Sequence, residues 1–170
     1  MVTSKPTNIY HYIHSYNDPH RNILYDNQLV GGKAKQLHNI DKELVPPWVV
    51  ITADCPDELL SDSIHIAWSE LAHSLKPYPI VLHTTRYAVR SSALAEDGEK
   101  KSYAGIFESK LKVPVTGLEQ AAREVRLSGL KDMVNFYEEE DGYNYTNKER
   151  EEIEYKRATN VAVIIMPMVD

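Results

Sequence analysis

The sequence predicts an α+β fold in which helices cover a mixed or antiparallel sheet. Apolar runs rich in β-branched residues, typical of buried strands, recur along the chain. They lie near Trp48, from Ile80 to Arg90, from Tyr103 to Val113 and from Val161 to Met166. Apolar residues at helical spacing predict helices between these runs, near Lys33, Ser63 and Leu118.

The composition is that of a soluble globular domain. The chain has 170 residues, 42% of them apolar and 26% charged, which is enough for one domain with a real core. A formal net charge of −6 argues against nonspecific binding to nucleic acid or to an anionic membrane. The single cysteine, Cys55, excludes an internal disulfide and fits the cytoplasm. The sequence contains no segment that resembles a signal peptide or a membrane span.

Residues 1–22 are expected to form a lead-in to the domain. Within it, Ile9–Ile13 alternates apolar and polar side chains and predicts a short strand. Three nearby histidines, His11, His14 and His20, raise the alternative of a metal site. Because no carboxylate or thiol joins them at a suitable spacing, surface histidines are the better interpretation, and we predict no metal ligands.

Two glycines, Gly31 and Gly32, precede Lys33 and a helix-forming segment that continues to Ile40. Glycine lets a backbone approach a ligand closely, and a helix N-terminus points free N–H groups at an anion. Lysine adds a mobile charge, so this segment predicts an anion site. The Walker A spacing is absent, and a plain loop before a helix is the alternative.

The middle of the chain supplies core elements. A rigid Pro-Pro pair precedes a buried strand predicted at Trp48–Ile51. An amphipathic helix is predicted from Ser61 to Lys76, and Pro77 ends it. Its apolar stripe consists of Ile64, Trp68, Leu71 and Leu75. We expect this stripe to pack in the core rather than to form a binding groove.

The most informative stretch begins with the strand predicted at Ile80–Arg90. This strand is expected to end abruptly at Arg90, Ser91 and Ser92, and a charged loop follows through Lys101. A fixed guanidinium, two hydroxyls and free backbone N–H groups at a strand end suit a polyanion such as a phosphate chain. An ordinary strand–loop–strand with an exposed arginine is the alternative.

The remaining residues add a helix and the last strand. Thr116 and Glu119 have the spacing of a capping box, and the helix is predicted from about Leu118 to about Tyr137. The run of carboxylates at 138–141 is interpreted as a solvated helix end. The β-branched run from Val161 to Val169 predicts a buried strand.

The segment from Ala88 to Ser109 has the sequence AVRSSALAEDGEKKSYAGIFES. It resembles the VRSSA-x-x-ED and S-[FY]-A-G signature in the nucleotide-binding domain of the pyruvate phosphate dikinase and phosphoenolpyruvate synthase family. The segment VGGKAKQL around Lys33 and the last β-branched run resemble two further motifs of this family. Where the last motif has glutamine, this chain has Met166, which cannot replace the hydrogen bonds of an amide.

The resemblance extends from about Leu29 to Val169. It implies an ATP-grasp-like N-terminal subdomain, the first half of a dikinase-type nucleotide domain, assigned here to residues 23–170. The implied ligand is ATP, with Arg90 as the catalytic residue on the γ-phosphate side and Lys33 on the phosphate chain. The other implied nucleotide contacts are Ser91, Ser92, Gly105 and Ser109. The resemblance also implies Mg²⁺, whose ligands are expected outside this chain.

Three functions are consistent with this resemblance. The first is the ATP-binding part of a phosphotransferase, which passes a phosphoryl group from ATP to a histidine domain and on to pyruvate or another acceptor. The expected partners are then the second ATP-grasp half and the phosphohistidine domain, in cis or in trans, and activity requires both. The second is a non-catalytic module that regulates or binds a protein. The third is a relative that phosphorylates a drug or a glucan hydroxyl. The open edge of the cleft is expected to favour self-association.

Overall fold

The computed structural model describes residues 8–18, 24, 27–75, 85–93, 109–127, 146–149 and 161–168. Its strands are β1 (Ile13–Ser15), β2 (Val49–Ile51), β3 (Tyr87–Ala93), β4 (Ser109–Val113) and β5 (Val161–Pro167). Its α-helices are α1 (Asn27–Asn39), α2 (Asp57–Ser74) and a helix over residues 118–127, and its 3-10 turns are η1 (Ile9–Tyr12) and η4 (Val115–Gly117).

The strands form one sheet in the order β1-β2-β5-β3-β4. Each pair of neighbouring strands in the described residues is antiparallel, which confirms the predicted α+β class and selects the antiparallel alternative. β5, the last strand in sequence, lies in the middle of the sheet between β2 and β3. This central position explains its continuous apolar sequence, because both of its faces are covered.

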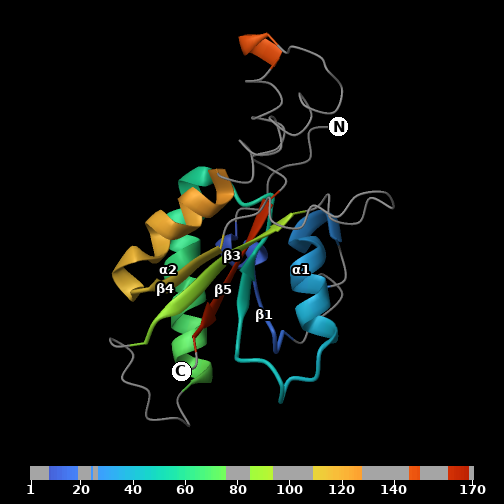
Figure 1. The fold of residues 1–170 in the computed structure, drawn as a ribbon, viewed down its shortest axis with the longest axis vertical. Coiled ribbons are helices and arrows are strands. Elements are labelled where there is room, and N and C mark those ends of the chain that lie inside the picture. The colour runs from blue at the N-terminus through green and yellow to red at the C-terminus, as the bar shows by residue number, and fades with distance from the viewer. Residues whose placement is uncertain are drawn as a thin grey trace.

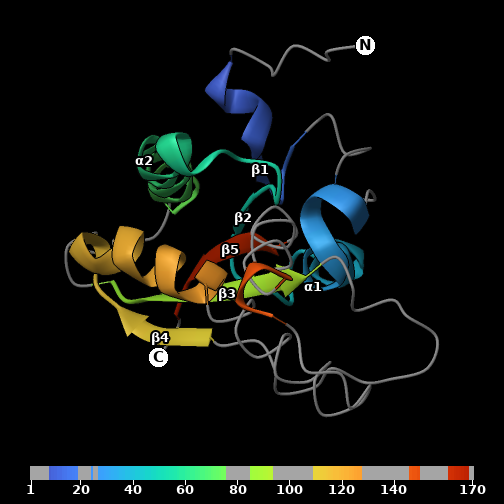
Figure 2. The same cartoon turned by 90° about the horizontal axis from the view of Figure 1, so that it is seen from above.

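Helices cover both faces of the sheet. Figures 1 and 2 show α1 on one side, with α2 and the helix over 118–127 on the other. Side chains along each strand alternate between the two sides: Val163 packs in the core under α2, and Ile164 packs in the core under α1. The predicted stripe of α2 lies in the α2-side core, where Ile64 and Leu71 are buried and Trp68 is half-buried.

Three predicted element boundaries are wrong. α2 spans Asp57–Ser74 instead of Ser61 to Lys76. The segment Ile9–Tyr12 forms a 3-10 turn instead of a strand, because the Asn8 side chain accepts the N–H of Tyr10 and turns the backbone. β3 does not end at Arg90–Ser92 but continues to Ala93, since β5 pairs with it along this whole length. The predicted strand end with free N–H groups is therefore absent there. The segments 76–84, 94–108 and 128–145, which carry parts of other predicted elements, lie outside the described residues.

A buried arginine fixes the loop that follows β2. The Arg126 guanidinium donates to the carbonyl oxygens of Ala53 (2.8 Å) and Cys55 (2.7 Å), and its other terminal nitrogen lies 3.2 Å from an Asp57 carboxylate oxygen. These bonds tie the helix over 118–127 to the start of α2. Burial raises the pKa of the Cys55 thiol, so this cysteine remains protonated near neutral pH.

Three titratable side chains meet where α2 packs on β1. The His14 ring lies 2.8 Å from the Asp18 carboxylate through Nδ1 and 2.9 Å from the His11 carbonyl through Nε2. Glu70 faces this pair from α2. Its burial, and secondarily the negative charge of Asp18, raise the pKa of Glu70, while His14 acts in the opposite direction.

The contact between α1 and β3 is unusually close. Gly31 interrupts α1 with a φ of +74°, a conformation that glycine adopts without strain. A Cβ built on Gly31 would meet the backbone oxygen of Ser92 at 2.5 Å. The Ser92 hydroxyl in turn accepts the N–H of Ala34 at 3.2 Å, at the start of the second segment of α1. Because Gly31 has no side chain, the second segment of α1 can start in direct contact with β3.

We expect Gly31→Ala to lower the free energy of unfolding by about 1–3 kcal/mol, because the new methyl group meets backbone atoms and the left-handed φ is strained. Urea denaturation followed by circular dichroism measures this loss. Gly117→Ala is the matched control, since its Cβ would meet no atom closer than 3.4 Å. Equal stability of Gly31→Ala and the wild-type protein would contradict the close contact.

We expect Glu70→Gln to raise stability at neutral pH. A carboxyl group whose pKa is raised by folding destabilises the folded state above its unfolded pKa, and this cost disappears as the pH falls below its ordinary value of 4.5. The gain over the wild-type protein should therefore shrink on acidification. Denaturation between pH 4 and 8 tests this, with Asp62→Asn, an exposed carboxylate on the same helix, as control. A gain that does not depend on pH would refute the explanation.

Candidate functional site

The two predicted cationic residues, Lys33 and Arg90, line the same pocket. Its volume is about 250 Å³, and it lies between α1 and the sheet. The residues that line it are Lys33, Gln36, Leu37, Ile40, Arg90 and Ile164. The fold thus brings together the charged residues of two motifs that are far apart in the sequence.

Strand register directs Arg90 into this pocket. Tyr87 and Val89 belong to the core on the α2 side, so the alternate residue Arg90 projects from the α1 side. On the two neighbouring strands, Ile164 and Ser109 lie directly opposite Arg90. Residues paired in this way share a face of the sheet, so the Ser109 side chain lies beside Arg90.

The guanidinium of Arg90 carries a polar atom whose hydrogen bonding is incomplete. Its Nε is buried and has no hydrogen-bond partner among the described residues. A buried donor without an acceptor costs free energy, and the Nε of Arg126 is in the same state, so this atom does not by itself indicate a ligand.

The two serines of the signature take different places. Ser92 shares the face of Arg90, is fully buried, and its hydroxyl accepts the Ala34 N–H of α1. Ser91 is also fully buried but alternates to the opposite face, and its hydroxyl has no partner among the described residues. Gly105 lies outside the described residues. Of the predicted contacts, Lys33 and Arg90 line the pocket, and Ser109 is paired with Arg90 on the neighbouring strand.

The glycine motif serves the packing of α1 on β3 in this structure. Gly31 approaches the backbone of Ser92, and the N–H of Ala34 at the helix start is bonded to the Ser92 hydroxyl. The predicted free N–H group of the helix start is thus occupied at Ala34. The positive charge that the pocket offers comes from the side chains of Lys33 and Arg90.

The apolar wall of the pocket was not predicted from the sequence. Leu37 comes from α1, Ile40 directly follows the end of α1, and Ile164 comes from β5. Gln36, Leu37 and Ile40 stand three, four and seven positions after Lys33. This is the spacing of residues on one face of a helix. That spacing could have identified them, whereas the approach of Ile164 depends on strand pairing.

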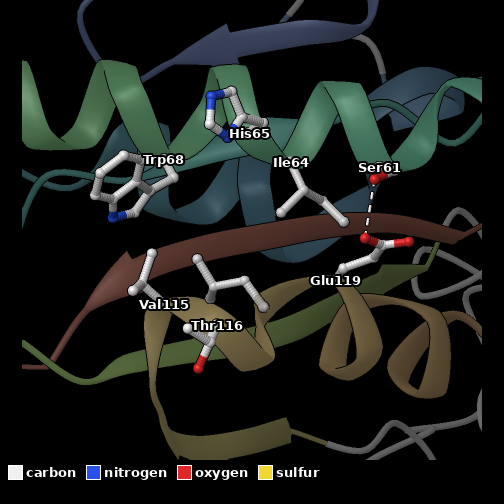
Figure 3. A pocket seen from close by; sticks show the side chains of 8 residues that line it. Ser61, Ile64, His65, Trp68, Val115, Thr116 and Glu119 are labelled. Atoms are coloured by element: carbon white, nitrogen blue, oxygen red, sulfur yellow. Dashed lines mark hydrogen bonds between the residues drawn. The ribbon is translucent and has the colours of Figure 1, made fainter. Parts of the chain in front are cut away.

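A second pocket of about 170 Å³ lies between α2 and the segment 115–119, away from Lys33 and Arg90. Figure 3 shows one hydrogen bond among its lining residues, from Ser61 to Glu119. The Ser61 hydroxyl donates to one Glu119 oxygen at 2.9 Å, and Arg123 pairs with the other at 3.1 Å. Both contacts lower the pKa of Glu119. The bond from Ser61 also joins α2 to the helix over 118–127. The predicted capping-box partner of Glu119, Thr116, is thus replaced by Ser61.

The described part of the chain contains no group of three or more histidine, cysteine, aspartate or glutamate side chains that could hold a metal ion. His20 lies outside it, and both ring nitrogens of His14 are engaged. Among the described helices, none is long and apolar enough to cross a membrane.

The family of the chain follows from comparison with protein-family models. Residues 58–170, more than half of the chain, match the model described as pyruvate phosphate dikinase, AMP/ATP-binding domain. The chain therefore belongs to this family of nucleotide-binding domains, which confirms the resemblance seen in the sequence. The match includes Arg90 and Ser109 but begins after Lys33. No curated protein matches the chain significantly.

We expect Ser92→Ala to lower the free energy of unfolding by about 1 kcal/mol or more, because the Ala34 N–H loses its acceptor in a buried position. Urea denaturation measures the loss. Ser69→Ala is the matched control, since that exposed hydroxyl bonds only to a carbonyl of its own helix. Similar effects of the two substitutions would show that the bond to Ala34 contributes little.

Proposed function

We propose that this domain binds the phosphate chain of ATP between Lys33 and Arg90, as the ATP-binding part of a dikinase-type phosphotransferase. The observation that carries the proposal is that these two cationic side chains, from distant parts of the sequence, line one pocket. Membership of an AMP/ATP-binding family supports the choice of ligand.

Each residue has a distinct task in this proposal. Arg90 offers a planar guanidinium that binds two phosphate oxygens at once on the γ-phosphate side, and it is the catalytic residue. Lys33 contributes a mobile point charge to the rest of the chain. Ser109 adds a hydroxyl beside Arg90. Phosphoryl transfer depends on charge neutralisation and alignment more than on covalent chemistry by the protein, so these groups suit it.

The size of the pocket fits the phosphates better than a whole nucleotide. A volume of about 250 Å³ lies below the roughly 300–1,000 Å³ of typical small-molecule pockets. The nucleoside then extends beyond the cationic part, and Gly105 is proposed to border it. Ser91 and Ser92 contribute through the position of the strand that carries Arg90.

The rest of the reaction is assigned to other domains. We propose that the phosphoryl group passes to a histidine domain and then to pyruvate or another acceptor, including a drug or glucan hydroxyl. Mg²⁺ would neutralise charge on the phosphates, and we propose that its ligands come from the second ATP-grasp half. We place this activity in the cytoplasm.

The surface around the pocket supports a role in assembly. Ile40, at the pocket rim, is 42% exposed, and Leu44 is 77% exposed on the loop after α1. Exposed apolar residues at the edge of a ligand site favour contact with another domain or with a second copy of the chain. In the proposal, the second ATP-grasp half covers this edge.

Titration of ATP into the full chain by calorimetry, with and without Mg²⁺, tests the binding site. We expect Lys33→Ala and Arg90→Ala each to weaken binding about 10-fold or more, because each removes a charge-assisted hydrogen bond. Lys35→Ala removes a charge from the same helix outside the pocket, and Arg123→Ala removes one on the other face of the sheet. Both controls should bind ATP as the wild-type protein does.

Two results would contradict the proposal. Saturable binding that neither substitution weakens would place the site elsewhere. A folded wild-type protein that releases no heat at millimolar ATP would show that this domain does not bind ATP by itself, which leaves a site that needs the second ATP-grasp half or a non-catalytic module.

A further inference from the structure

The hydroxyl of Ser92 connects the two elements that carry the cations of the pocket. Ser92 stands on β3 two positions after Arg90, so both side chains leave the strand on the side that α1 covers. Its Oγ accepts the N–H of Ala34 at 3.2 Å, and Ala34 directly follows Lys33 in the chain. One hydrogen bond therefore joins the strand of one cation to the helix of the other.

This bond lies where the second segment of α1 begins. Gly31 interrupts the helix with a φ of +74° and a ψ of 170°. The first N–H groups after such a break have no acceptor within their own helix, and a side-chain oxygen that accepts one of them fixes where the helix starts. Ser92 fills this role for α1 from the neighbouring strand. Because Gly31 allows close contact, the helix start lies directly against Ser92.

The Ser92 hydroxyl is poorly placed to be a ligand of the phosphates itself. It is fully buried, and it already accepts a hydrogen bond from the backbone. Among the described residues, Lys33 and Arg90 line the pocket, whereas Ser92 does not. An effect of Ser92 on a bound anion would therefore act through the position of another side chain.

We propose that Ser92 is a positioning residue, which sets the spacing between the Lys33 ammonium and the Arg90 guanidinium by fixing the start of α1 on β3. This inference rests on the proposed ATP site. A polyphosphate that bridges two cations depends on their spacing, because charge-assisted hydrogen bonds are strong only at the right geometry. Loss of the bond to Ala34 should release Lys33 from its place and leave Arg90 on its paired strand.

Binding of ATP and of inorganic tripolyphosphate to the full chain, measured by calorimetry, tests this role with a double-mutant cycle. We expect Ser92→Ala to weaken both ligands about 3- to 10-fold. In a Lys33→Ala background the same substitution should have little further effect, because the cation that it displaces is already gone. In a Lys35→Ala background, where the lost charge lies outside the pocket, the full effect of Ser92→Ala should remain.

Two further variants separate positioning from loss of stability. Ser63→Ala removes another fully buried hydroxyl, which contacts Cys55 at the α2 side of the sheet, and it should leave the binding of both ligands unchanged. Ser92→Cys keeps the shape of the side chain but offers only a weak acceptor. It replaces Ser92→Ala if that variant does not fold, and it should show the same dependence on Lys33.

Other results would overturn the inference in distinguishable ways. Equal effects of the Ser92 substitution with and without Lys33 would show that Ser92 does not act through Lys33. A folded Ser92→Ala protein that binds both ligands as the wild-type protein does would show that the bond to Ala34 does not position the site. Both results leave the proposed ATP site intact. If the folded wild-type protein binds neither ligand, or if Lys33→Ala and Arg90→Ala bind both normally, the proposed ATP site fails in this chain and this inference fails with it.

Discussion

The close approach of Gly31 to Ser92 positions the rest of the candidate site. The backbone of α1 lies so near β3 that a single Cβ at Gly31 would meet the strand at 2.5 Å, and the Ser92 hydroxyl bonds to the helix start. With the helix fixed at this point, Lys33 follows two residues later and lines the same pocket as Arg90. A glycine motif that looks like a ligand loop in sequence thus joins two elements of the fold.

Three consecutive residues of β3 serve three purposes because side chains alternate along a strand. Arg90 faces the pocket, Ser91 is buried on the opposite face, and Ser92 bonds to α1. The strand can carry these residues because β5 pairs with it through Ala93 and keeps its register. The guanidinium therefore projects from the interior of a sheet, where its backbone is fixed, rather than from a loop.

The family match and the pocket define different parts of the site. The match to the AMP/ATP-binding domain begins at residue 58, so it contains Arg90 but not Lys33. The pocket shows that the segment before the match supplies the second cation and most of the apolar wall. The proposed nucleotide site thus takes one cation from each segment.

The sequence by itself determined the α+β class, the strand of β5 and the amphipathic helix α2, and its motifs singled out Lys33 and Arg90 as candidate site residues. These follow from local patterns: β-branched runs, apolar spacing, and charged residues beside small ones. It placed the end of β3 too early, because pairing with a strand 70 residues away decides how far that strand continues. Only the tertiary structure brought Ile164 to the pocket, committed Ser92 to the helix and turned Ser91 away. Those outcomes depend on strand register and on the closeness of α1, which no local pattern encodes.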